Sequence, residues 1–339
     1  MKKNSCFIIA EIGVNHNNNM SLAKKLITEA KKTGADAVKF QTFKADTLAL
    51  KKTPKVPYQK RSGSIKESHH LMLKKLELSK KDHFILKKFC EKEKIEFIST
   101  PYDINSARFL DNLGVKTFKV ASADIVDHQL HEFLAKKKKK VIISTGMASM
   151  KEIKEVLQIY KSNKNNKFSL LHCVSNYPCS DKSLNLKNII TLNKIFKCKI
   201  GFSDHSVGNQ AAIMSIGYGA HIIEKHFTLN KNMKGPDQLA SSTPKEFRSL
   251  VKDVRRAENM RGSHLRKLQK EEIIMKKISR KSLIYNNNLL RNHILSENDI
   301  SLIRPGTGIL GNNFKYFVGK KLKKKVKKFE QIKFAHVKK

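Results

Sequence analysis

Short apolar runs alternate with amphipathic segments along most of the chain, and this alternation constrains the fold more than any other feature. Helical spacing between strand-length runs is typical of parallel sheets with helical connections. The predicted strands are Phe7–Ile12, Ala37–Phe43, Ile95–Thr100, Thr117–Ala121, Lys140–Ser144, Phe168–Cys173, Lys199–Phe202 and Ile222–Phe227. The predicted helices are Ser21–Lys32, Lys81–Lys92, Ser149–Lys161, Gly208–Gly219 and Pro244–Asn259. Eight such repeats over about 260 residues predict an α/β fold of the (β/α)8 or TIM-barrel type.

The alternative architecture is an open, doubly wound sheet. It would place a Gly-x-Gly-x-x-Gly turn after the first strand, where the backbone binds a dinucleotide phosphate. The chain instead reads Glu11-Ile-Gly-Val-Asn-His16 at that point. The sequence therefore favours the barrel.

The chain changes character after residue 260. Residues 1–260 are predicted to form the barrel domain, residues 261–278 a polar helical linker, and residues 279–339 a small β-rich domain. The predicted strands of the small domain are Ser282–Tyr285, Ser301–Arg304 and Phe329–His336. Because a domain of about 60 residues buries little apolar surface, we expect it to need a partner.

Polar residues stand at or just after the ends of the predicted strands. They are Glu11, Lys39, Gln41, Ser99, Thr100, Lys119, Ser122, Ser144, His172, Ser203, His205, Glu224 and His226. In a parallel barrel the C-terminal ends of the strands share one mouth, where catalytic side chains lie. We therefore expect these residues to form one polar, functional mouth.

The residue types at this mouth indicate its chemistry. Lysine charge combined with several hydroxyl donors suits a phosphate or a carboxylate. The lysines are Lys39 and Lys119, and the hydroxyls belong to Thr100, Ser122, Ser144 and Ser203. His205 and His226 end consecutive strands, so their imidazoles can meet on one metal ion. Two histidines leave positions for water and substrate oxygens, which favours an octahedral divalent ion over a closed zinc site.

The net charge is +40 over 339 residues, with 69 Lys and Arg against 29 Asp and Glu. Nucleic-acid readers concentrate arginine and aromatic residues on one surface. Here the excess is lysine spread along the chain, and tryptophan is absent. We interpret the charge as surface composition and predict no nucleic-acid partner.

The sequence also bears on location. No apolar run approaches the ~20 residues that a membrane span needs. The first apolar stretch stops at Glu11, too early for an export signal. The five cysteines are scattered and form no Cys-x-x-Cys pair. These features predict a cytoplasmic protein that does not contact a membrane.

Motifs at the strand ends resemble those of the sialic acid (nonulosonate) synthase family. They are Ala10-Glu-Ile-Gly-Val-Asn-His16, Val38-Lys-Phe-Gln-Thr42, Phe97-Ile-Ser-Thr-Pro101, Phe118-Lys-Val-Ala-Ser122, Ile143-Ser-Thr-Gly-Met147, Leu171-His-Cys-Val-Ser-Asn-Tyr-Pro178, Gly201-Phe-Ser-Asp-His205, Glu224-Lys-His-Phe-Thr228 and Gly235-Pro-Asp237. Residues 279–339, with Leu302-Ile-Arg-Pro-Gly-Thr-Gly308, resemble the antifreeze-like (SAF) domain that ends these enzymes. The resemblance runs in order over nearly the whole chain.

The resemblance implies a transferase that condenses phosphoenolpyruvate with N-acetylmannosamine or a related N-acetylated hexosamine. The product is a nine-carbon α-keto acid, and phosphate leaves by C–O cleavage. The resemblance also implies a divalent ion, Mn²⁺ or Mg²⁺, and a domain-swapped homodimer in which the SAF domain covers the partner's mouth. The default sugar is N-acetylmannosamine, and its main rival is a 2,4-diacetamido-6-deoxyhexose, the substrate of legionaminate or pseudaminate synthases.

Residue roles follow from the matched motifs alone. The implied catalytic residues are Glu11, Asp124 and the two metal ligands, His205 and His226. The implied phosphoenolpyruvate contacts are Lys39, Thr100, Lys119, Ser122, Ser144, Ser175 and Ser203. The implied sugar contacts are Gln41, Tyr177, Asp237 and Arg304, with Arg304 supplied by the partner subunit. Asp124 stands where some members have the longer Glu, and Ser175 where some have Asn.

Two other hypotheses use the same residues or the same charge. A barrel aldolase would form a Schiff base on Lys39 or Lys119. A polyanion-binding protein on an inactive barrel would use the lysine excess and lose affinity as salt rises.

Overall fold

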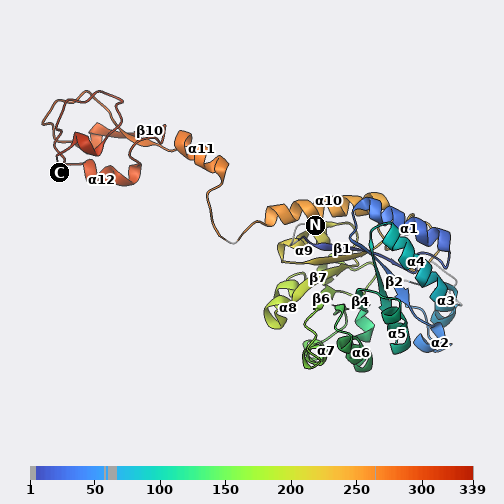
Figure 1. Ribbon diagram of the computed structural model, residues 1–339. Helices are drawn as coiled ribbons and strands as arrows, with labels where there is room; N and C mark the ends of the chain where they lie inside the picture. The colour runs from blue at the N-terminus through green and yellow to red at the C-terminus, as the bar shows by residue number, and fades with distance from the viewer. Residues whose placement is uncertain (1–4, 57–58, 60–66, 264, 339) are drawn as a thin grey trace. The chain divides into compact units, whose positions relative to one another are not determined.

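The computed structural model describes residues 5–56, 59, 67–263 and 265–338, and it separates into two compact units, Met1–Gly262 and Ser263–Lys339. In the first unit eight parallel strands close into a barrel in the order of the chain, and helices lie outside the strands (Figure 1). The strands are β1 (Phe7–Gly13), β2 (Ala37–Thr42), β3 (Glu96–Pro101), β4 (Thr117–Val120), β5 (Lys140–Ser144), β6 (Phe168–Cys173), β7 (Lys199–Asp204) and β8 (Ile222–His226). The predicted barrel is confirmed.

The helices of the first unit are α1 (Met20–Thr33), α2 (Ala45–Leu48), α3 (His69–Leu76), α4 (Lys80–Lys92), α5 (Ile104–Asn112), α6 (His128–Lys136), α7 (Met150–Ser162), α8 (Asn188–Phe196), α9 (Gln210–Gly217) and α10 (Pro244–Arg261). Local side chains set where several of them begin. Ser149 and Glu152 form a reciprocal capping box at the start of α7, and Thr243 and Glu246 do the same at α10. The five predicted helices are present as α1, α4, α7, α9 and α10, whereas α2, α3, α5, α6 and α8 were not predicted.

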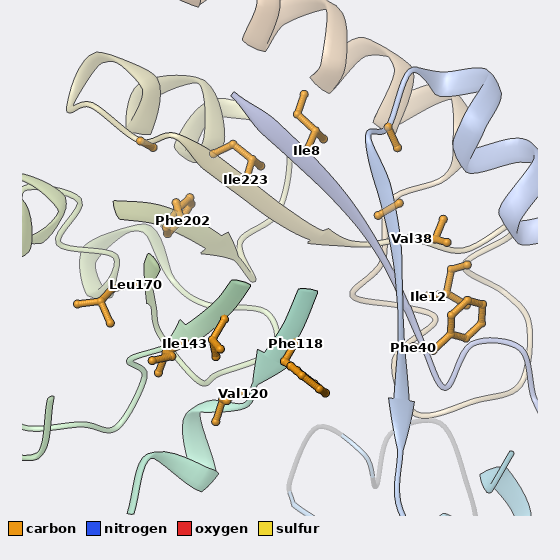
Figure 2. Close-up of a cluster of buried hydrophobic side chains, with 14 of the residues drawn as sticks. Ile8, Ile12, Val38, Phe40, Phe118, Val120, Ile143, Leu170, Phe202 and Ile223 are labelled. Carbon is orange, nitrogen blue, oxygen red and sulfur yellow. The ribbon is translucent and has the colours of Figure 1, made fainter. Parts of the chain in front are cut away.

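Successive side chains of each strand point to opposite faces, and this alternation builds the barrel in layers. The outward side chains form an apolar layer between the strands and the helices. Figure 2 shows ten of them: Ile8, Ile12, Val38, Phe40, Phe118, Val120, Ile143, Leu170, Phe202 and Ile223. All ten are fully buried, so this layer anchors the helices to the barrel.

The inward side chains form a second, smaller apolar cluster inside the barrel. It consists of Ile9, Ala37, Ile98, Ile142, Leu171 and Ile222. Two residues further along the same strands, the inward positions become Glu11, Lys39, Thr100, Ser144, Cys173 and Glu224. The barrel interior therefore changes from apolar to polar between one inward-facing residue of each strand and the next, and the polar layer forms the mouth.

The second unit contains α11 (Lys270–Ser279), β9 (Ser282–Tyr285), β10 (Ile300–Ile303) and α12 (Phe314–Phe317). Its two strands pair antiparallel, with Leu302 opposite Leu283. It has its own apolar core, which includes Tyr285, Phe317 and Leu322. No helix among the described residues has both the length and the apolar character needed to cross a membrane.

Two predictions for the C-terminal part need correction. The expected strand Phe329–His336 is not formed: Phe329 has a positive φ of 67°, Gln331 makes only an isolated bridge to Ile284, and Phe334–His336 is a short 3₁₀ turn. The left-handed backbone at Phe329 interrupts the extended run. The expected helical linker is helical only in its second half, because α10 ends at Arg261 and α11 begins at Lys270.

The barrel interior generates the first prediction. At Gly201, in β7, an added Cβ would lie 2.6 Å from each of three atoms, the Cβ and O of Ile222 and a Cδ of Leu171. We expect Gly201→Ala to lower the free energy of unfolding by about 1–3 kcal/mol, because an overpacked interior must shift. Urea unfolding followed by circular dichroism measures this.

The matched control is Gly217→Ala in α9, where an added Cβ meets no atom within 4 Å. Because alanine favours a helix over glycine, this variant should be as stable as the wild type or more stable by up to about 1 kcal/mol. Equal unfolding midpoints for Gly201→Ala and the wild type would contradict the packing described here.

Candidate active site

A cavity of about 770 Å³ opens at the C-terminal ends of the barrel strands. Of the residues predicted for the site, those that line it are Glu11, Lys39, Gln41, Thr100, Lys119, Ser122, Asp124, Ser144, Ser175, Tyr177, Ser203, His205, His226 and Asp237. Arg304 is the exception: it lies in the second unit, where its Nε donates to the Ser279 carbonyl oxygen. The structure therefore brings together at one cavity all the barrel residues to which the resemblance assigned a catalytic, metal-binding or substrate-binding role.

A buried charge cluster occupies the floor of this cavity. Lys39 Nζ lies 2.8 Å from Glu11 Oε2 and 3.9 Å from Glu224 Oε2. Lys119 Nζ lies 3.6 Å from Glu224 Oε1. All four side chains are at most 6% exposed. Glu224 thus lies between the two lysines, a position that sequence reasoning did not assign although it placed Glu224 at a strand end.

The pKa values of this cluster follow from burial and mutual attraction. Burial alone would raise the pKa of Glu224, but the ammonium groups of Lys119 and Lys39 outweigh it and lower that pKa, so Glu224 is ionised. At Glu11 burial prevails over the attraction of Lys39, and the pKa is raised. Burial lowers the pKa of Lys119. The cluster therefore combines one firmly ionised carboxylate with one carboxyl group that readily holds a proton.

Hydroxyl groups surround the two ammonium groups. Lys119 Nζ donates to Ser144 Oγ at 2.6 Å, and Lys39 Nζ donates to Thr100 Oγ1 at 3.3 Å. Ser203 Oγ donates to Glu224 Oε1 at 3.1 Å. Together these groups present positive charge and hydroxyl donors to the cavity, which is the arrangement that phosphate and carboxylate oxygens require.

Gly146 allows further polar groups to crowd one side of the cavity. Its backbone N–H donates to Ser122 Oγ at 3.0 Å. An added Cβ there would lie 2.4 Å from Ser175 Oγ and 2.8 Å from Ser122 Oγ. A side chain at position 146 would therefore displace both serines, so their close approach depends on Gly146, which sequence reasoning did not single out.

The imidazoles of His205 and His226 lie close together at an interplanar angle of 48°, with ring centroids 5.9 Å apart. His205 Nδ1 donates to the Val174 carbonyl oxygen at 2.8 Å, and since a carbonyl only accepts, the lone pair lies on Nε2. His226 Nδ1 is buried without a hydrogen-bond partner among the described residues. Burial lowers the pKa of His205 to about 4 and that of His226 to about 3. Both rings are therefore neutral at pH 7.

These two rings fit a divalent metal ion. Neutral imidazole is the metal-binding form, and His226 brings a buried nitrogen that lacks a partner in the described chain. Among the described residues, no group of three or more His, Cys, Asp or Glu side chains is placed to hold a metal. The protein would thus supply two ligands and leave the remaining positions to water or substrate oxygens.

Asp124 lies on the 3₁₀ segment Ser122–Val126 that follows β4. Its Oδ2 is buried and has no hydrogen-bond partner among the described residues. Burial raises the pKa of this carboxyl group to about 7, with a further contribution from Asp127. Asp124 is therefore a second carboxyl group at the cavity that exchanges its proton near neutral pH.

Three more predicted residues complete the rim. The Tyr177 ring lies 4.0 Å from the His205 ring and meets the His226 ring edge-on at 5.6 Å, measured between centroids. Gln41 Nε2 donates to Glu11 Oε1 at 3.5 Å. Asp237 lines the same cavity. A ligand at this rim would therefore contact the imidazoles and the carboxyl group of Glu11 together.

Two of the expected mouth residues point elsewhere, and these expectations are wrong. Ser99 Oγ lies 2.6 Å from Thr42 Oγ1 in the layer beneath the helices. His172 Nε2 donates to the Leu184 carbonyl oxygen at 2.6 Å, and its ring stacks on Phe202. Each is a sequence neighbour of an inward-facing residue, Thr100 or Cys173, so the alternation of the strand turns it outward.

An apolar wall bounds the cavity on the side of α2 and α3. It is formed by Val14, Leu48, Met72, Leu73, Leu76 and Tyr102, which belong to a separate small core. Sequence reasoning predicted no element between β2 and α4, so this wall was missed. The available signal was the apolar spacing of the His69–Leu76 segment after Ser68, which caps α3 through Leu71 N.

Comparison with known proteins connects this site to a family. Residues 26–266 match the NeuB family. The chain is 43% identical over 322 residues to N,N'-diacetyllegionaminic acid synthase of Legionella pneumophila subsp. pneumophila, over 94% of this chain and 90% of that protein. It is 41% identical over 334 residues to the synthase of the same name from Campylobacter jejuni subsp. jejuni, over 98% of this chain and 99% of that protein.

A solved structure is similar as well. N-acetylneuraminic acid (sialic acid) synthetase from Leptospira borgpetersenii serovar Hardjo-bovis, crystallised with citrate, matches with a TM-score of 0.72 at 36% sequence identity. The match covers 80% of this chain and 90% of that one.

The raised pKa of Asp124 generates the second prediction. Between pH 4 and pH 7 the folded chain holds a proton on Asp124 that the unfolded chain releases, so this group lowers stability as pH rises through that window. Asp124→Asn removes the effect. We expect the free energy of unfolding of the variant to match that of the wild type near pH 4 and to exceed it by about 4 kcal/mol at pH 8 in metal-free urea unfolding.

Asp46→Asn is the control of opposite sign. The hydrogen bonds from Lys74 and His70 lower the pKa of Asp46, so its carboxylate stabilises the fold above the pKa of the unfolded chain. This variant should lose stability relative to the wild type as pH rises. If the difference in free energy of unfolding between Asp124→Asn and the wild type does not change with pH, the raised pKa of buried Asp124 is refuted.

Proposed function

The chain belongs to the NeuB family, and on this premise we propose that it condenses phosphoenolpyruvate with an N-acetylated hexosamine to a nonulosonic acid. The observation that carries the proposal is the floor of the cavity. There, two buried lysines ringed by hydroxyls lie beside a pair of neutral imidazoles. An enol phosphate needs the first feature, and activation of a sugar aldehyde needs the second.

Phosphoenolpyruvate binds through its two anionic groups. Lys39 and Lys119 provide the charge, and the hydroxyls of Thr100, Ser122, Ser144, Ser175 and Ser203 provide directed hydrogen bonds. Because the lysines are already buried in a preformed pocket, the site does not have to desolvate them when substrate arrives. Their ion pairs with Glu11 and Glu224 hold the ammonium groups in place before the substrate binds.

The proposed reaction forms one carbon–carbon bond and breaks one carbon–oxygen bond. C3 of phosphoenolpyruvate attacks the sugar aldehyde carbon, and the aldehyde oxygen takes up a proton. Water adds to the cationic C2 that results and loses a proton. The tetrahedral intermediate then collapses: the C–O bond to phosphate breaks, the C2 hydroxyl becomes the keto oxygen, and its proton leaves with the inorganic phosphate. Lys39 and Lys119 stabilise the phosphate charge throughout.

Two carboxyl groups are suited to the proton transfers. Glu11 lies beside Gln41 at the sugar end, and its raised pKa lets it donate a proton to the aldehyde oxygen. Asp124, with a pKa of about 7, accepts the proton of the water that adds at C2. A general acid or base works best when its pKa lies near the operating pH, and burial supplies that match at both positions.

His205 and His226 would hold a divalent ion, Mn²⁺ or Mg²⁺. When bound, the ion polarises the sugar aldehyde as a Lewis acid. The chain's own part is to keep both imidazoles neutral through burial and to orient His205 through its bond to Val174.

For the sugar, we propose a 2,4-diacetamido-6-deoxyhexose in preference to N-acetylmannosamine. The two relatives named above are N,N'-diacetyllegionaminic acid synthases at 43% and 41% identity. The apolar wall of Leu48, Met72, Leu73 and Leu76 suits a sugar that carries a methyl group and a second acetyl group in place of hydroxyls. Gln41, Tyr177 and Asp237 provide the polar contacts.

The remaining parts of the proposal concern assembly and location. We propose that residues 279–339 form an SAF domain that supplies Arg304 to the cavity of a partner subunit in a domain-swapped homodimer. Arg304 is exposed in its own unit and so is free to contact another chain. We also propose a cytoplasmic location, with which the five unpaired cysteines agree.

The third prediction tests the reaction itself. Release of inorganic phosphate should require phosphoenolpyruvate, the N-acetylated hexosamine and a divalent ion together. A phosphate-release assay, with EDTA dialysis followed by return of Mn²⁺, measures each requirement. Full activity after exhaustive chelation would refute the role of the ion, and activity without sugar would refute the condensation.

A separate trapping experiment distinguishes the synthase from the aldolase hypothesis. A Schiff-base enzyme forms an adduct with pyruvate that borohydride reduces to a stable product on Lys39 or Lys119. We expect no mass increase on either lysine after borohydride treatment with pyruvate. A trapped adduct would replace the synthase proposal with the aldolase.

The fourth prediction concerns the sugar. We expect kcat/KM for the 2,4-diacetamido-6-deoxy sugar to exceed that for N-acetylmannosamine by about 10-fold or more, since one or two apolar groups in a matched pocket give differences of this size. Mass detection of the nine-carbon product measures both. Met72→Gln makes the wall more polar and should therefore bring the two kcat/KM values closer together. A wild-type kcat/KM that is higher for N-acetylmannosamine would reverse the choice of sugar.

A further inference from the structure

A second buried ion pair joins the two strands that carry the imidazoles. Asp204 and Lys225 are direct Cα partners in the pairing of β7 with β8. Lys225 Nζ lies 2.6 Å from Asp204 Oδ2 and donates to the Ser206 carbonyl oxygen at 2.9 Å. Asp204 Oδ1 accepts from Ser206 N at 2.9 Å and from Ser206 Oγ at 2.6 Å. Both charged side chains are at most 3% exposed.

This pair does not belong to the cavity. Neither residue lines it, whereas their neighbours Ser203, His205, Glu224 and His226 all do. The alternation of the strands turns Asp204 and Lys225 away from the mouth, into the layer beneath the helices. The pair therefore touches no substrate, and any effect on the reaction acts through the residues next to it.

The bonded residues Asp204, Ser206 and Lys225 form a network, and each is a direct sequence neighbour of one of the two histidines. Asp204 precedes His205, and Ser206 follows it, so both neighbours of His205 are held by the same set of bonds. Lys225 directly precedes His226. One network thus fixes the backbone on both sides of the first imidazole and immediately before the second.

Stability alone is a weak reason for such a pair. Replacing a buried ion pair with apolar side chains of similar volume is often neutral or stabilising, because desolvation of the charges offsets their attraction. An apolar pair has no directional bonds and so cannot fix the two strand ends relative to each other. The hydrogen bonds between Asp204, Ser206 and Lys225 can, because they form only over a narrow range of distances and angles.

We propose that the Asp204–Lys225 pair is a positioning element that sets the separation of the His205 and His226 imidazoles for a shared divalent ion. This inference rests on the proposed function, which places that ion between the two rings. Asp204 and Lys225 are positioning residues in this role.

The fifth prediction tests it with the full-length protein and Mn²⁺ alone, without phosphoenolpyruvate or sugar. The double variant Asp204→Asn/Lys225→Met removes both charges, leaves no unpaired ion, and keeps the Oδ1 acceptor for Ser206. We expect it to fold like the wild type by circular dichroism and to bind Mn²⁺ about 10-fold more weakly, as changes around metal ligands do. Electron paramagnetic resonance of the free ion measures the affinity.

The matched control is Asp36→Asn/Arg255→Met. It makes the same kinds of substitution in an ion pair of 3.0 Å between Asp36, the residue before β2, and Arg255 of α10, at the opposite end of the strand from the mouth. This control should bind Mn²⁺ as tightly as the wild type. Mn²⁺ affinity of the Asp204→Asn/Lys225→Met variant within twofold of the wild type would overturn the inference and leave the proposed function standing.

Two further outcomes are distinguishable. Wild-type protein that takes up no Mn²⁺ at millimolar concentration would overturn the metal site of the proposed function and this inference with it. If the double variant does not fold, Lys225→Arg provides the same readout, because it keeps the charge but cannot place a planar guanidinium where a compact ammonium reached two oxygens. A several-fold weaker Mn²⁺ affinity supports the inference, and an unchanged affinity overturns it.

Discussion

The mouth of the barrel depends on the attraction between Glu224 and the two lysines on either side of it. The side chains of Lys39 and Lys119 are at most 6% exposed. An unpaired ammonium group at either position would destabilise the fold by about 3–5 kcal/mol. Glu224 and Glu11 make the burial tolerable, and Ser203, Ser144 and Thr100 satisfy the remaining polar atoms. The same bonds that stabilise the charges also hold them in position for a ligand. Structure and anion recognition therefore depend on the same contacts.

Most of this arrangement could be predicted because a parallel barrel converts sequence position into spatial position. Once Ile9, Ala37 and Ile222 are recognised as inward residues, the residues two positions later must face the mouth, and these are Glu11, Lys39 and Glu224. The same rule explains the two errors. Ser99 and His172 were assigned to the mouth because they are polar and near a strand end, although each is one residue out of phase with Ile98 and Leu171. Strict use of the period of two would have excluded both.

Other parts of the site depend on contacts that no local pattern contains. Glu224 could be placed at a strand end, but its position between two lysines depends on β2 and β4 lying within reach across the barrel. Gly146 matters only because Ser122 and Ser175 converge on it from other elements. The wall formed by Leu73 and its neighbours follows a long connection between β2 and α4 whose course is set by packing. In the second unit, Phe329 adopts a left-handed backbone that its sequence does not favour, and the expected strand fails there.

The net charge of +40 has little to do with the function proposed here, because most of the lysines lie on the surface, where water and salt screen their charge from the cavity. Surface lysines are screened over a Debye length of about 8 Å at physiological ionic strength, so most of them act weakly on the cavity floor. The charges that matter are the few that water does not reach. There Glu224 offsets the charge of the two lysines, and Glu11 adds to this only while it is ionised, because its raised pKa lets it take up a proton readily. An arriving anion raises that pKa further, because it disfavours the second carboxylate. The site can thus match the charge of its ligand by taking up a proton at Glu11, which is also the group that the proposed reaction requires as an acid.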